Sequence, residues 1–273
     1  MRIPRVVATD LDGTLLRSDS TLSPRTRHAL RAARAAGIRV VAATARPARV
    51  VAHVFSDTDL LDAVICGNGA VRFDPATREL TLTHPLLPPL AIHVMTEVGR
   101  LMPQTWFATE TGHHVLHERG YHYRPSLDDA RFPVPTREDL VTAPVVKLMA
   151  LVSHADPGDA WSVLRPTLGD LVTCTWSAGH GAADLGYPSI LEIAALGVSK
   201  SAALANLCTQ WMVEPADVAA FGDAPNDLDM LIWAGAGYAV ANAHPEVLAV
   251  AAHRVPTNDE DGVAQFLERI TAG

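Results

Sequence analysis

The N-terminal part of the chain alternates short apolar runs with amphipathic segments. The valine and alanine run from Val6 to Ala8 suits a strand that is buried on both faces. Ser23 followed by Pro24 is typical of a helix start, and Gly37 is typical of a helix end. The pattern predicts strands at 6–8, 38–43 and 63–66 joined by helices at 24–36 and 47–55, which is the order of a parallel sheet covered by helices.

The pattern changes after the third of these strands. Two alternating segments, 71–73 and 80–82, flank the turn-rich sequence Asp74-Pro75-Ala76-Thr77 and predict a hairpin. Proline and histidine are frequent from about residue 85 to 188. Here the sequence predicts helices at 90–101 and from residue 157, and strands at 106–108, 115–116, 145–152 and 172–176. This mixture is typical of an inserted α+β domain.

The parallel pattern returns with the apolar strand at 190–193. Helices are expected at 199–211, 226–233 and 262–270, and strands at 218–221 and 238–240. We therefore expect an α/β fold with a Rossmann-like parallel-sheet core. The core would consist of residues 1–84 and 189–273, and an α+β domain of residues 85–188 would be inserted into it.

Composition and charge narrow the classes of partner. Of the 273 residues, 48% are hydrophobic and 19% are charged, as in globular proteins. Thirty acidic against 22 basic residues give a net charge of −8, which disfavours nucleic acid as a partner. The nearly uncharged stretch 231–243 is shorter than the roughly 20 residues of a membrane span, and Asp10 interrupts any signal-peptide pattern. We expect a cytoplasmic protein that binds neither nucleic acid nor membrane.

Polar residues collect where the predicted core strands end. Ligands of open parallel sheets bind beyond the carboxyl ends of the strands, so these residues are expected to lie close together. Lys200 lies at the start of a predicted helix, where free backbone N–H groups also favour an anion. The segments that follow the strands are Asp10-Leu11-Asp12-Gly13-Thr14, Thr44-Ala45-Arg46, Gly67-Asn68-Gly69 and Gly222-Asp223-Ala224-Pro225-Asn226-Asp227.

Several carboxylates at one edge repel one another unless a cation shares them. Hard oxygen ligands suit Mg²⁺, which also takes up substrate phosphate and waters. A carboxylate that attacks a phosphoryl group needs charge neutralisation, which Mg²⁺, Lys200 and helix N–H groups can supply together. Thr44 can add a hydroxyl donor, and a protonated Asp12 can donate to the leaving oxygen and later deprotonate water. The pattern predicts a magnesium site for a small phosphorylated metabolite.

Four segments resemble, in order and spacing, the motifs of the haloacid dehalogenase (HAD) superfamily. They are DLDGTLL from Asp10, Thr44 followed by Arg46, GVSKSAAL around Lys200 and GDAPNDLDM from Gly222. GNGA, VANAHPEV and TNDEDGVA are similar to the Cof-type branch, subfamily IIB. The resemblance covers residues 5–75 and 189–270, and the insert matches only loosely. It implies a HAD-like core with a C2-type α+β cap between the second and third motifs.

The resemblance also implies a role for each matching residue. Asp10 matches the nucleophile, which forms an aspartyl-phosphate and binds Mg²⁺, and Asp12 matches the general acid/base, whose backbone carbonyl also binds the metal. Thr44, the N–H of Ala45, Lys200 and Asn226 are the expected phosphate-binding groups, Asp223 is the further metal ligand, and Asp227 has a supporting place. Apart from the resemblance, Asn68 is a further supporting candidate, because it could reach substrate from the edge of the sheet. Ala45 and Ser201 stand where glycine is common, and neither change removes a catalytic group.

Simpler interpretations apply to single residues. Asp12-Gly13 is a common turn pair, Thr44 and Asn226 can cap helices, and Lys200 can be a surface lysine. Asn68 and Asn242 fit turn chemistry as well as contact with substrate. The histidines suggest a zinc site, but a strand would place them on different faces, so a polar surface is the favoured interpretation. They are His113, His114, His117 and His122.

The motifs in combination predict a Mg²⁺-dependent phosphatase that hydrolyses small phosphomonoesters, with sugar phosphates as the first choice. We expect it to act as a monomer or a homodimer. Two other hypotheses stay open: a phosphomutase or phosphotransferase with the same intermediate on Asp10, and a non-catalytic module that senses sugar phosphates. The presence of Asp10, Asp12 and Lys200 favours an enzyme over the sensor.

Overall fold

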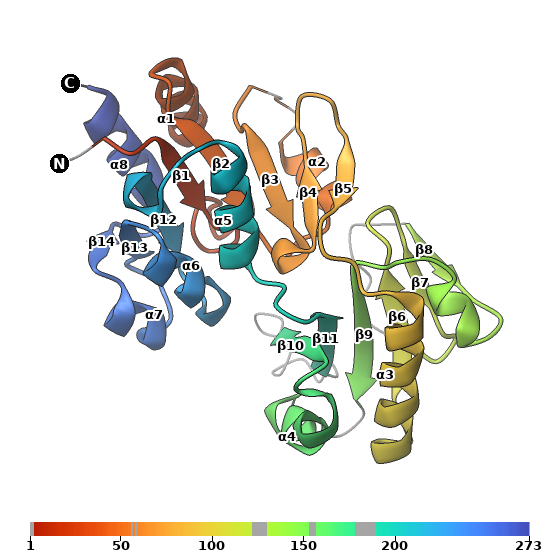
Figure 1. The fold of residues 1–273 in the computed structure, drawn as a ribbon. Helices are drawn as coiled ribbons and strands as arrows, with labels where there is room; N and C mark the ends of the chain where they lie inside the picture. Colours follow the sequence, from red (N-terminus) through yellow and green to blue (C-terminus); the bar gives the residue numbers. More distant parts are fainter. Residues whose placement is uncertain are drawn as a thin grey trace. The chain divides into compact units, whose positions relative to one another are not determined.

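The chain divides into two compact units in the computed structural model of the protein (Figure 1). Met1–Thr83 and Ser199–Gly273 form one unit, which we call the core, and His84–Val198 form the other, which we call the insert. The structure describes residues 3–55, 57, 59–121, 130–152, 157–177 and 189–272. The core is therefore assembled from both ends of the chain.

The described part of the core is built on an eight-stranded sheet in the order β14-β13-β12-β1-β2-β3-β4-β5. The strands from β14 to β3 in this order run parallel, and β4 and β5 add the predicted antiparallel hairpin at one edge. β1 (Val6–Thr9) and β12 (Val218–Gly222) are buried along their whole length, as suits strands covered on both faces. The others are β2 (Arg39–Ala43), β3 (Ala63–Cys66), β4 (Val71–Phe73), β5 (Leu80–Leu82), β13 (Ala236–Val240) and β14 (His253–Val255).

Pairs of helices cover both faces of the core sheet (Figure 1). On one face α1 (Pro24–Ala35) packs against α8 (Gly262–Thr271), and on the other α5 (Lys200–Gln210) packs against α6 (Leu228–Trp233). Ser23 caps α1 by accepting the N–H of Thr26, and Pro24 opens that helix. The shorter helices are α2 (Ala48–Val54) and α7 (Pro245–Val250).

The insert contains a six-stranded sheet in the order β10-β11-β9-β6-β7-β8. Neighbouring strands are antiparallel except for the parallel pair of β7 and β8. A buried apolar cluster joins α3 (Pro88–Leu101) and α4 (Pro157–Leu168) to one face of the sheet. The strands are β6 (Trp106–Glu110), β7 (Val115–His117), β8 (Arg131–Pro133), β9 (Lys147–Val152), β10 (Val172–Ser177) and β11 (Ser189–Ala195).

The structure differs from the sequence pattern at the end of the insert. The pattern assigns residues 190–193 to the core, whereas β11 pairs antiparallel with β9 and β10, and the insert extends to Val198. The expected helix at 226–233 is divided into a 3-10 turn at Pro225–Asp227 and the helix α6. β8, β14 and α7 have no counterpart among the predicted elements, because segments of three to six residues show little periodicity.

The histidine-rich segment forms a strand over three residues only. His113 and His114 lie between β6 and β7, and His117 is the last residue of β7. His122 lies outside the described residues. The strand therefore extends one residue beyond the predicted 115–116 and does not include His113 or His114.

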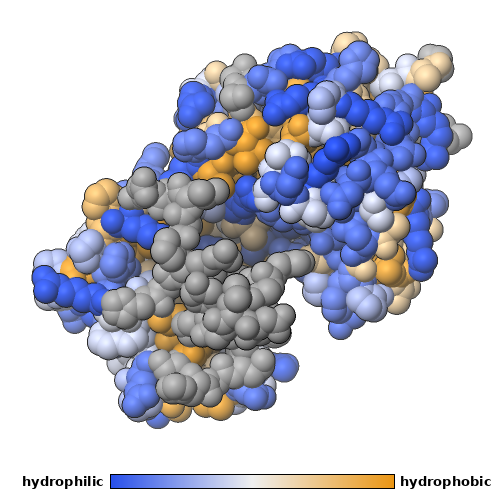
Figure 2. Space-filling model, turned by 180° about the vertical axis from the view of Figure 1, so that it is seen from behind, coloured by the Kyte–Doolittle hydropathy of each residue, from blue (hydrophilic) through white to orange (hydrophobic). Residues whose placement is uncertain are grey.

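Hydrophilic residues dominate the described surface on the face drawn in Figure 2, and hydrophobic residues form separate small areas there. The large exposed hydrophobic side chains are spread over both units, for example Met212 and Ile232 in the core and Phe132 in the insert. Such scattered exposure is ordinary for a globular surface. Within the described ranges, the structure contains no helix with the length and hydropathy of a membrane span.

Candidate active site

The candidate site begins where β1 and β12 end side by side. The chain continues from β1 to β2 on one side, while β12 lies on the other, and ligands of α/β sheets bind beyond the strand ends at such a switch in strand order. Asp10 follows β1, and its N–H donates to the carbonyl of Phe221 in β12 at 2.9 Å. Asp223 follows β12. The sheet therefore brings together two carboxylates that are more than 200 positions apart in the sequence.

Lys200 is a buried cation between two of the carboxylates. It is the first residue of α5, whose N-cap Ser199 accepts the N–H of Ala202. Its Nζ lies 2.6 Å from Asp10 Oδ1 and 2.7 Å from Asp227 Oδ1, and its side chain is 2% exposed. Burial by itself lowers the pKa of this amine, but the facing carboxylates raise it above its ordinary value, so Lys200 stays protonated.

Asp227 holds both Lys200 and the loop that contains Asp223. Its Oδ2 accepts the backbone N–H groups of Asp223 and Ala224 at 3.1 and 3.0 Å, while its Oδ1 contacts the lysine. Its carboxylate is completely buried. A Cβ atom on Gly222 would lie 2.5 Å from that of Asp227, so the end of β12 leaves room only for glycine. Asp227 thus fixes the shape of this part of the site.

Three carboxylates lie close enough to share a cation. One oxygen each from Asp10, Asp223 and Asp227 lies within 4.8 Å of the others. Burial raises the pKa of Asp10 well above its ordinary value, Asp227 and Asp223 raise it further, and Lys200 opposes them. A small group of carboxylate oxygens is the donor set that suits Mg²⁺, and a divalent cation would relieve their repulsion. The residues present therefore fit the magnesium ion that the sequence predicts.

The second carboxylate of the DLDGT segment lies apart from this group. The side chain of Asp12 is 52% exposed and forms a two-pronged ion pair with Arg46, whose Nε lies 2.7 Å from Asp12 Oδ2. The predicted metal-binding set of Asp10, Asp12 and Asp223 thus differs from the observed carboxylate group, in which Asp227 takes the place of Asp12. The family resemblance assigns only the backbone carbonyl of Asp12 to the metal, and this assignment stays a prediction.

The loops after β2 and β3 are tied to each other. The N–H of Asn68 donates to the carbonyl of Thr44 at 3.0 Å, and the N–H of Gly67 donates to the carbonyl of Arg46 at 3.1 Å. Thr44 is 1% exposed, and its hydroxyl accepts the N–H of Arg46 at 3.1 Å. Ala45 lies between them and is half-buried. The predicted phosphate-binding loop is therefore held by backbone N–H groups of the loop after β3 and by the Thr44 hydroxyl.

Asn68 joins this loop to the one that contains Asp223. Its Oδ1 accepts a hydrogen bond from Asn226 Nδ2 at 3.1 Å. Its φ of 56° is left-handed, a conformation that asparagine tolerates better than most residues. A Cβ atom on the neighbouring Gly69 would lie 2.3 Å from the carbonyl oxygen of Ser199, so this loop approaches the start of α5 closely. The structure thus brings the segments of Asn68, Asn226 and Lys200 together.

Thr14 and Gly13 contact the carboxylate of Asp223, a role that the sequence pattern did not assign to them. Thr14 Oγ1 donates to Asp223 Oδ1 at 2.8 Å. Gly13 has a left-handed φ of 80°, and a Cβ atom there would lie 2.5 Å from Asp223 Oδ2. The signal was present, because both residues belong to the DLDGT segment. Through them, the loop after β1 packs closely against the carboxylate of Asp223.

We expect Gly13→Ala to weaken Mg²⁺ binding by about tenfold or more, because the added methyl group displaces Asp223. The matched control is Gly37→Ala, where φ is 82° but no atom lies within 4 Å of the added Cβ. Both variants incur the strain of a left-handed alanine, roughly 1–2 kcal/mol, and only Gly13→Ala disturbs a ligand. Isothermal titration with MgCl₂ measures the affinities, and equal values for Gly13→Ala and the wild type would contradict this expectation.

Comparison with known proteins identifies the family of the chain. Residues 7–267 match the profile of a protein family described as haloacid dehalogenase-like hydrolase. The chain belongs to this family. The match spans the insert as well as the core, whereas the sequence motifs lie in the core alone. For this HAD hydrolase, the predictions of a parallel α/β core and of an inserted α+β domain are confirmed at the level of the fold.

Relatives of this HAD hydrolase include phosphatases. The 5-amino-6-(5-phospho-D-ribitylamino)uracil phosphatase YitU of Bacillus subtilis strain 168 is 28% identical over 270 residues, which cover 97% of each chain. The HMP-PP phosphatase of Cronobacter sakazakii is 30% identical over 258 residues, 91% of this chain and 88% of the relative. A solved sugar phosphatase of HAD subclass IIB shares the fold, with a TM-score of 0.75, 21% identity and coverage of 97% and 98%. The prediction of a HAD-type hydrolase of the phosphatase kind is confirmed at family level.

Proposed function

We propose that this HAD hydrolase is a Mg²⁺-dependent phosphatase of small phosphomonoesters, with sugar phosphates as its preferred class, and that Asp10 is its nucleophile. The observation that supports this most strongly is the buried Lys200 ammonium between Asp10 and Asp227, with Asp223 close enough to share a cation. The name of one relative contains a phosphorylated ribityl group, which supports a substrate of the sugar-phosphate kind.

The charges in the site explain how it would accept an anion. A phosphate ester is repelled by carboxylates, and the ammonium of Lys200 offsets only part of that repulsion. When bound by the side chains of Asp10 and Asp223, Mg²⁺ would add positive charge against the phosphoryl oxygens. The hydroxyl of Thr44 and the N–H of Ala45 are the proposed donors to the same oxygens. These groups would hold the phosphorus atom in front of Asp10.

The proposed reaction has two steps. In the first, a carboxylate oxygen of Asp10 attacks phosphorus, the bond to the leaving oxygen breaks, and Asp12 gives that oxygen its proton. In the second, water attacks the phosphorus of the aspartyl-phosphate, Asp12 takes a proton from the water, and inorganic phosphate leaves the restored Asp10. The ion pair with Arg46 holds the Asp12 side chain against the loop after β2.

We expect Asp12→Ala to lower kcat by about 10²–10⁴-fold for alkyl phosphates, because their leaving oxygen needs a proton. The loss should be smaller for the first step with p-nitrophenyl phosphate, whose leaving group departs as a stable anion. Single-turnover rates with one ester of each kind measure the difference. Asp19→Ala changes another exposed aspartate of the same loop and is the control. Equal losses for the two kinds of ester would argue against an acid role for Asp12.

A substrate screen tests the proposed function. The purified chain is assayed for released phosphate with hexose, pentose, triose, nucleotide and cofactor phosphates, in Mg²⁺ and in EDTA. We expect release that depends on Mg²⁺ and the highest kcat/KM for a sugar phosphate. No release from any ester would refute the proposal. Conversion of an ester to its isomer would favour a phosphomutase, and tight binding without turnover would favour a sensor.

A further inference from the structure

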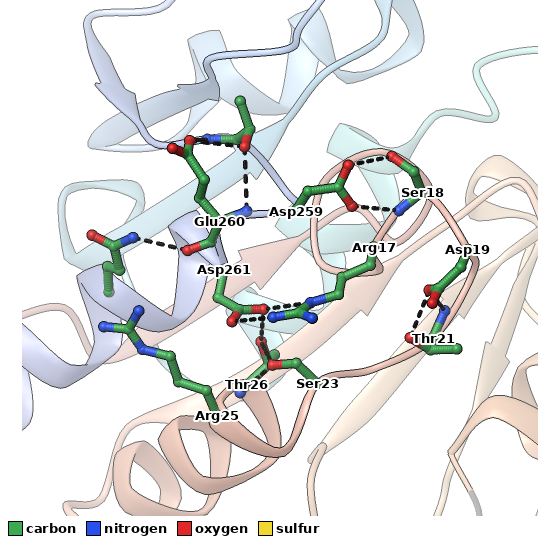
Figure 3. A network of polar contacts seen from close by, with 12 residues as sticks. Arg17, Ser18, Asp19, Thr21, Ser23, Arg25, Thr26, Asp259, Glu260 and Asp261 are labelled. Carbon is green, nitrogen blue, oxygen red and sulfur yellow. Dashed lines mark hydrogen bonds and ion pairs between the residues drawn. The ribbon is translucent and has the colours of Figure 1, made fainter.

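A turn near the C-terminus, residues 257–261, holds the loop that follows Asp12 (Figure 3). Asp261 forms a two-pronged ion pair with Arg17, at 3.1 Å to Nε and 2.7 Å to Nη2. Asp259 accepts both the N–H and the hydroxyl of Ser18, at 2.9 and 2.7 Å. Asn258 Nδ2 donates to the carbonyl of Leu16 at 2.9 Å. Three successive residues of the loop are therefore held by one turn.

The turn is itself closely packed. The N–H and the hydroxyl of Thr257 both donate to Glu260 Oε2, at 3.1 and 2.8 Å. Asp261 is buried and has a left-handed φ of 59°. A Cβ atom on Gly262 would lie 2.0 Å from the carbonyl oxygen of Pro256, so no larger residue fits there. A turn packed in this way is rigid, so the loop residues that bind to it are held in place.

Asn242 connects this turn to the active-site loops. Its Oδ1 accepts the backbone N–H of Asn258 at 3.0 Å, and its Nδ2 donates to the carbonyl of Gly13 at 2.8 Å. Both halves of the carboxamide are needed, because the first partner can only donate and the second can only accept. Two residues further along, the N–H of His244 donates to the carbonyl of Asp223 at 2.7 Å. Residues 242–244 therefore bind both the loop that contains Gly13 and the loop that contains Asp223. These are the two loops that pack against each other at the Asp223 carboxylate.

We propose that Asn242 is a positioning residue for the carboxylate site, an inference that rests on the proposed Mg²⁺-dependent function. Its carboxamide fixes the carbonyl of Gly13, while the same segment fixes the carbonyl of Asp223. The spacing between the DLDGT loop and the Asp223 carboxylate then determines how well the carboxylates share a cation. Mutation of residues that orient metal ligands typically weakens metal binding by about 10–100-fold. Asn242 acts through Gly13 and Asp223 and does not itself touch the reacting atoms.

Because the side chain of Asn242 is exposed, replacing it with alanine leaves no cavity in the core, so a change in Mg²⁺ affinity reports the lost hydrogen bonds. Mg²⁺ affinity is measured by titration calorimetry with MgCl₂ alone, and the unfolding temperature is measured in EDTA. We expect Asn242→Ala to bind Mg²⁺ about tenfold more weakly than the wild type. Asn206→Ala, at an exposed position of α5, is expected to leave both quantities unchanged. Ser18→Ala removes one hydrogen bond to the same turn and is expected to lower only the unfolding temperature.

An unchanged Mg²⁺ affinity in Asn242→Ala would overturn the inference. An equal loss in Ser18→Ala would also overturn it, because any loosening of the turn would then have the same effect. If Asn242→Ala does not fold, Asn242→Leu keeps a side chain of similar size without either hydrogen bond and is expected to bind Mg²⁺ about tenfold more weakly; wild-type affinity there would refute the role. A wild type that binds Mg²⁺ but hydrolyses no ester would refute the proposed function and leave the positioning role supported by the affinities.

Discussion

Asp10→Asn is expected to lower the rate of phosphate release by at least about 10⁴-fold, the scale of loss when a nucleophile is removed from an active site. The amide has the shape of the carboxylate but does not attack phosphorus under these conditions. Released phosphate is measured in Mg²⁺ with the best ester of the screen. Asp229→Asn, an exposed aspartate on α6, is the control and should keep full activity. Substantial activity in Asp10→Asn would contradict its role as nucleophile.

Although Asp10→Asn is expected to abolish most of the activity, it is expected to raise the stability of the metal-free protein. In the metal-free protein, burial raises the pKa of Asp10 well above the value of 3.8 expected when unfolded. Asp10 therefore stabilises the fold below its unfolded pKa, and this contribution is lost as the pH rises through the folded pKa. Asparagine has no such loss. The unfolding temperature of Asp10→Asn in EDTA should exceed that of the wild type by a margin that grows from about pH 4 toward neutrality. A margin that shrinks as the pH rises would contradict this.

Lys200→Met is expected to lower the free energy of unfolding by about 3–5 kcal/mol in EDTA, because it leaves two buried carboxylates without their cation. Methionine keeps most of the side-chain volume, so the effect reports the lost charge. Phosphate release should fall by about 10²–10³-fold, since a positive charge facing the phosphoryl group is removed. Denaturant titrations and steady-state rates measure the two losses.

A matched variant in the insert distinguishes the loss of a buried lysine charge at the carboxylate site from the same loss elsewhere in the protein. Lys147 Nζ lies 2.7 Å from Glu192 Oε2, and both side chains are largely buried. Lys147→Met should therefore also lower stability. Added Mg²⁺ should restore part of the stability lost in Lys200→Met, because it takes over the carboxylates, but should restore none in Lys147→Met. Equal responses to Mg²⁺ would show that the carboxylates near Lys200 do not bind it.

The core and its carboxylates were predictable because they depend on local patterns and one general rule. Valine-rich runs such as Val6–Thr9 identify buried parallel strands, and the carboxyl ends of such strands meet at one edge of the sheet. That rule is sufficient to place Asp10 beside Asp223. The start of α1 was also local, since Ser23 and Pro24 are adjacent in the sequence.

The boundary of the insert and the side-chain partners within the site could not be predicted, because they depend on contacts between residues far apart in the sequence. The apolar pattern of Ser189–Ala195 is the same for a parallel and an antiparallel strand, and only its pairing with β9 and β10 assigns it to the insert. Likewise, the ion pair of Asp12 with Arg46 and the bond from Asn242 to Gly13 join residues far apart in the chain. No local pattern predicts such side-chain partners.

The phosphorylation of Asp10 can be measured directly. Asp12→Ala is mixed with Mg²⁺ and excess p-nitrophenyl phosphate, quenched in acid and analysed by peptide mass spectrometry; without Asp12 the second step is slow, so the intermediate should accumulate. We expect one phosphoryl group on the peptide that contains Asp10, and none when Asp10→Asn is added to the same chain. Release of phosphate by the wild type with no phosphoryl group found on Asp10, or with one found on another residue, would contradict the proposed reaction.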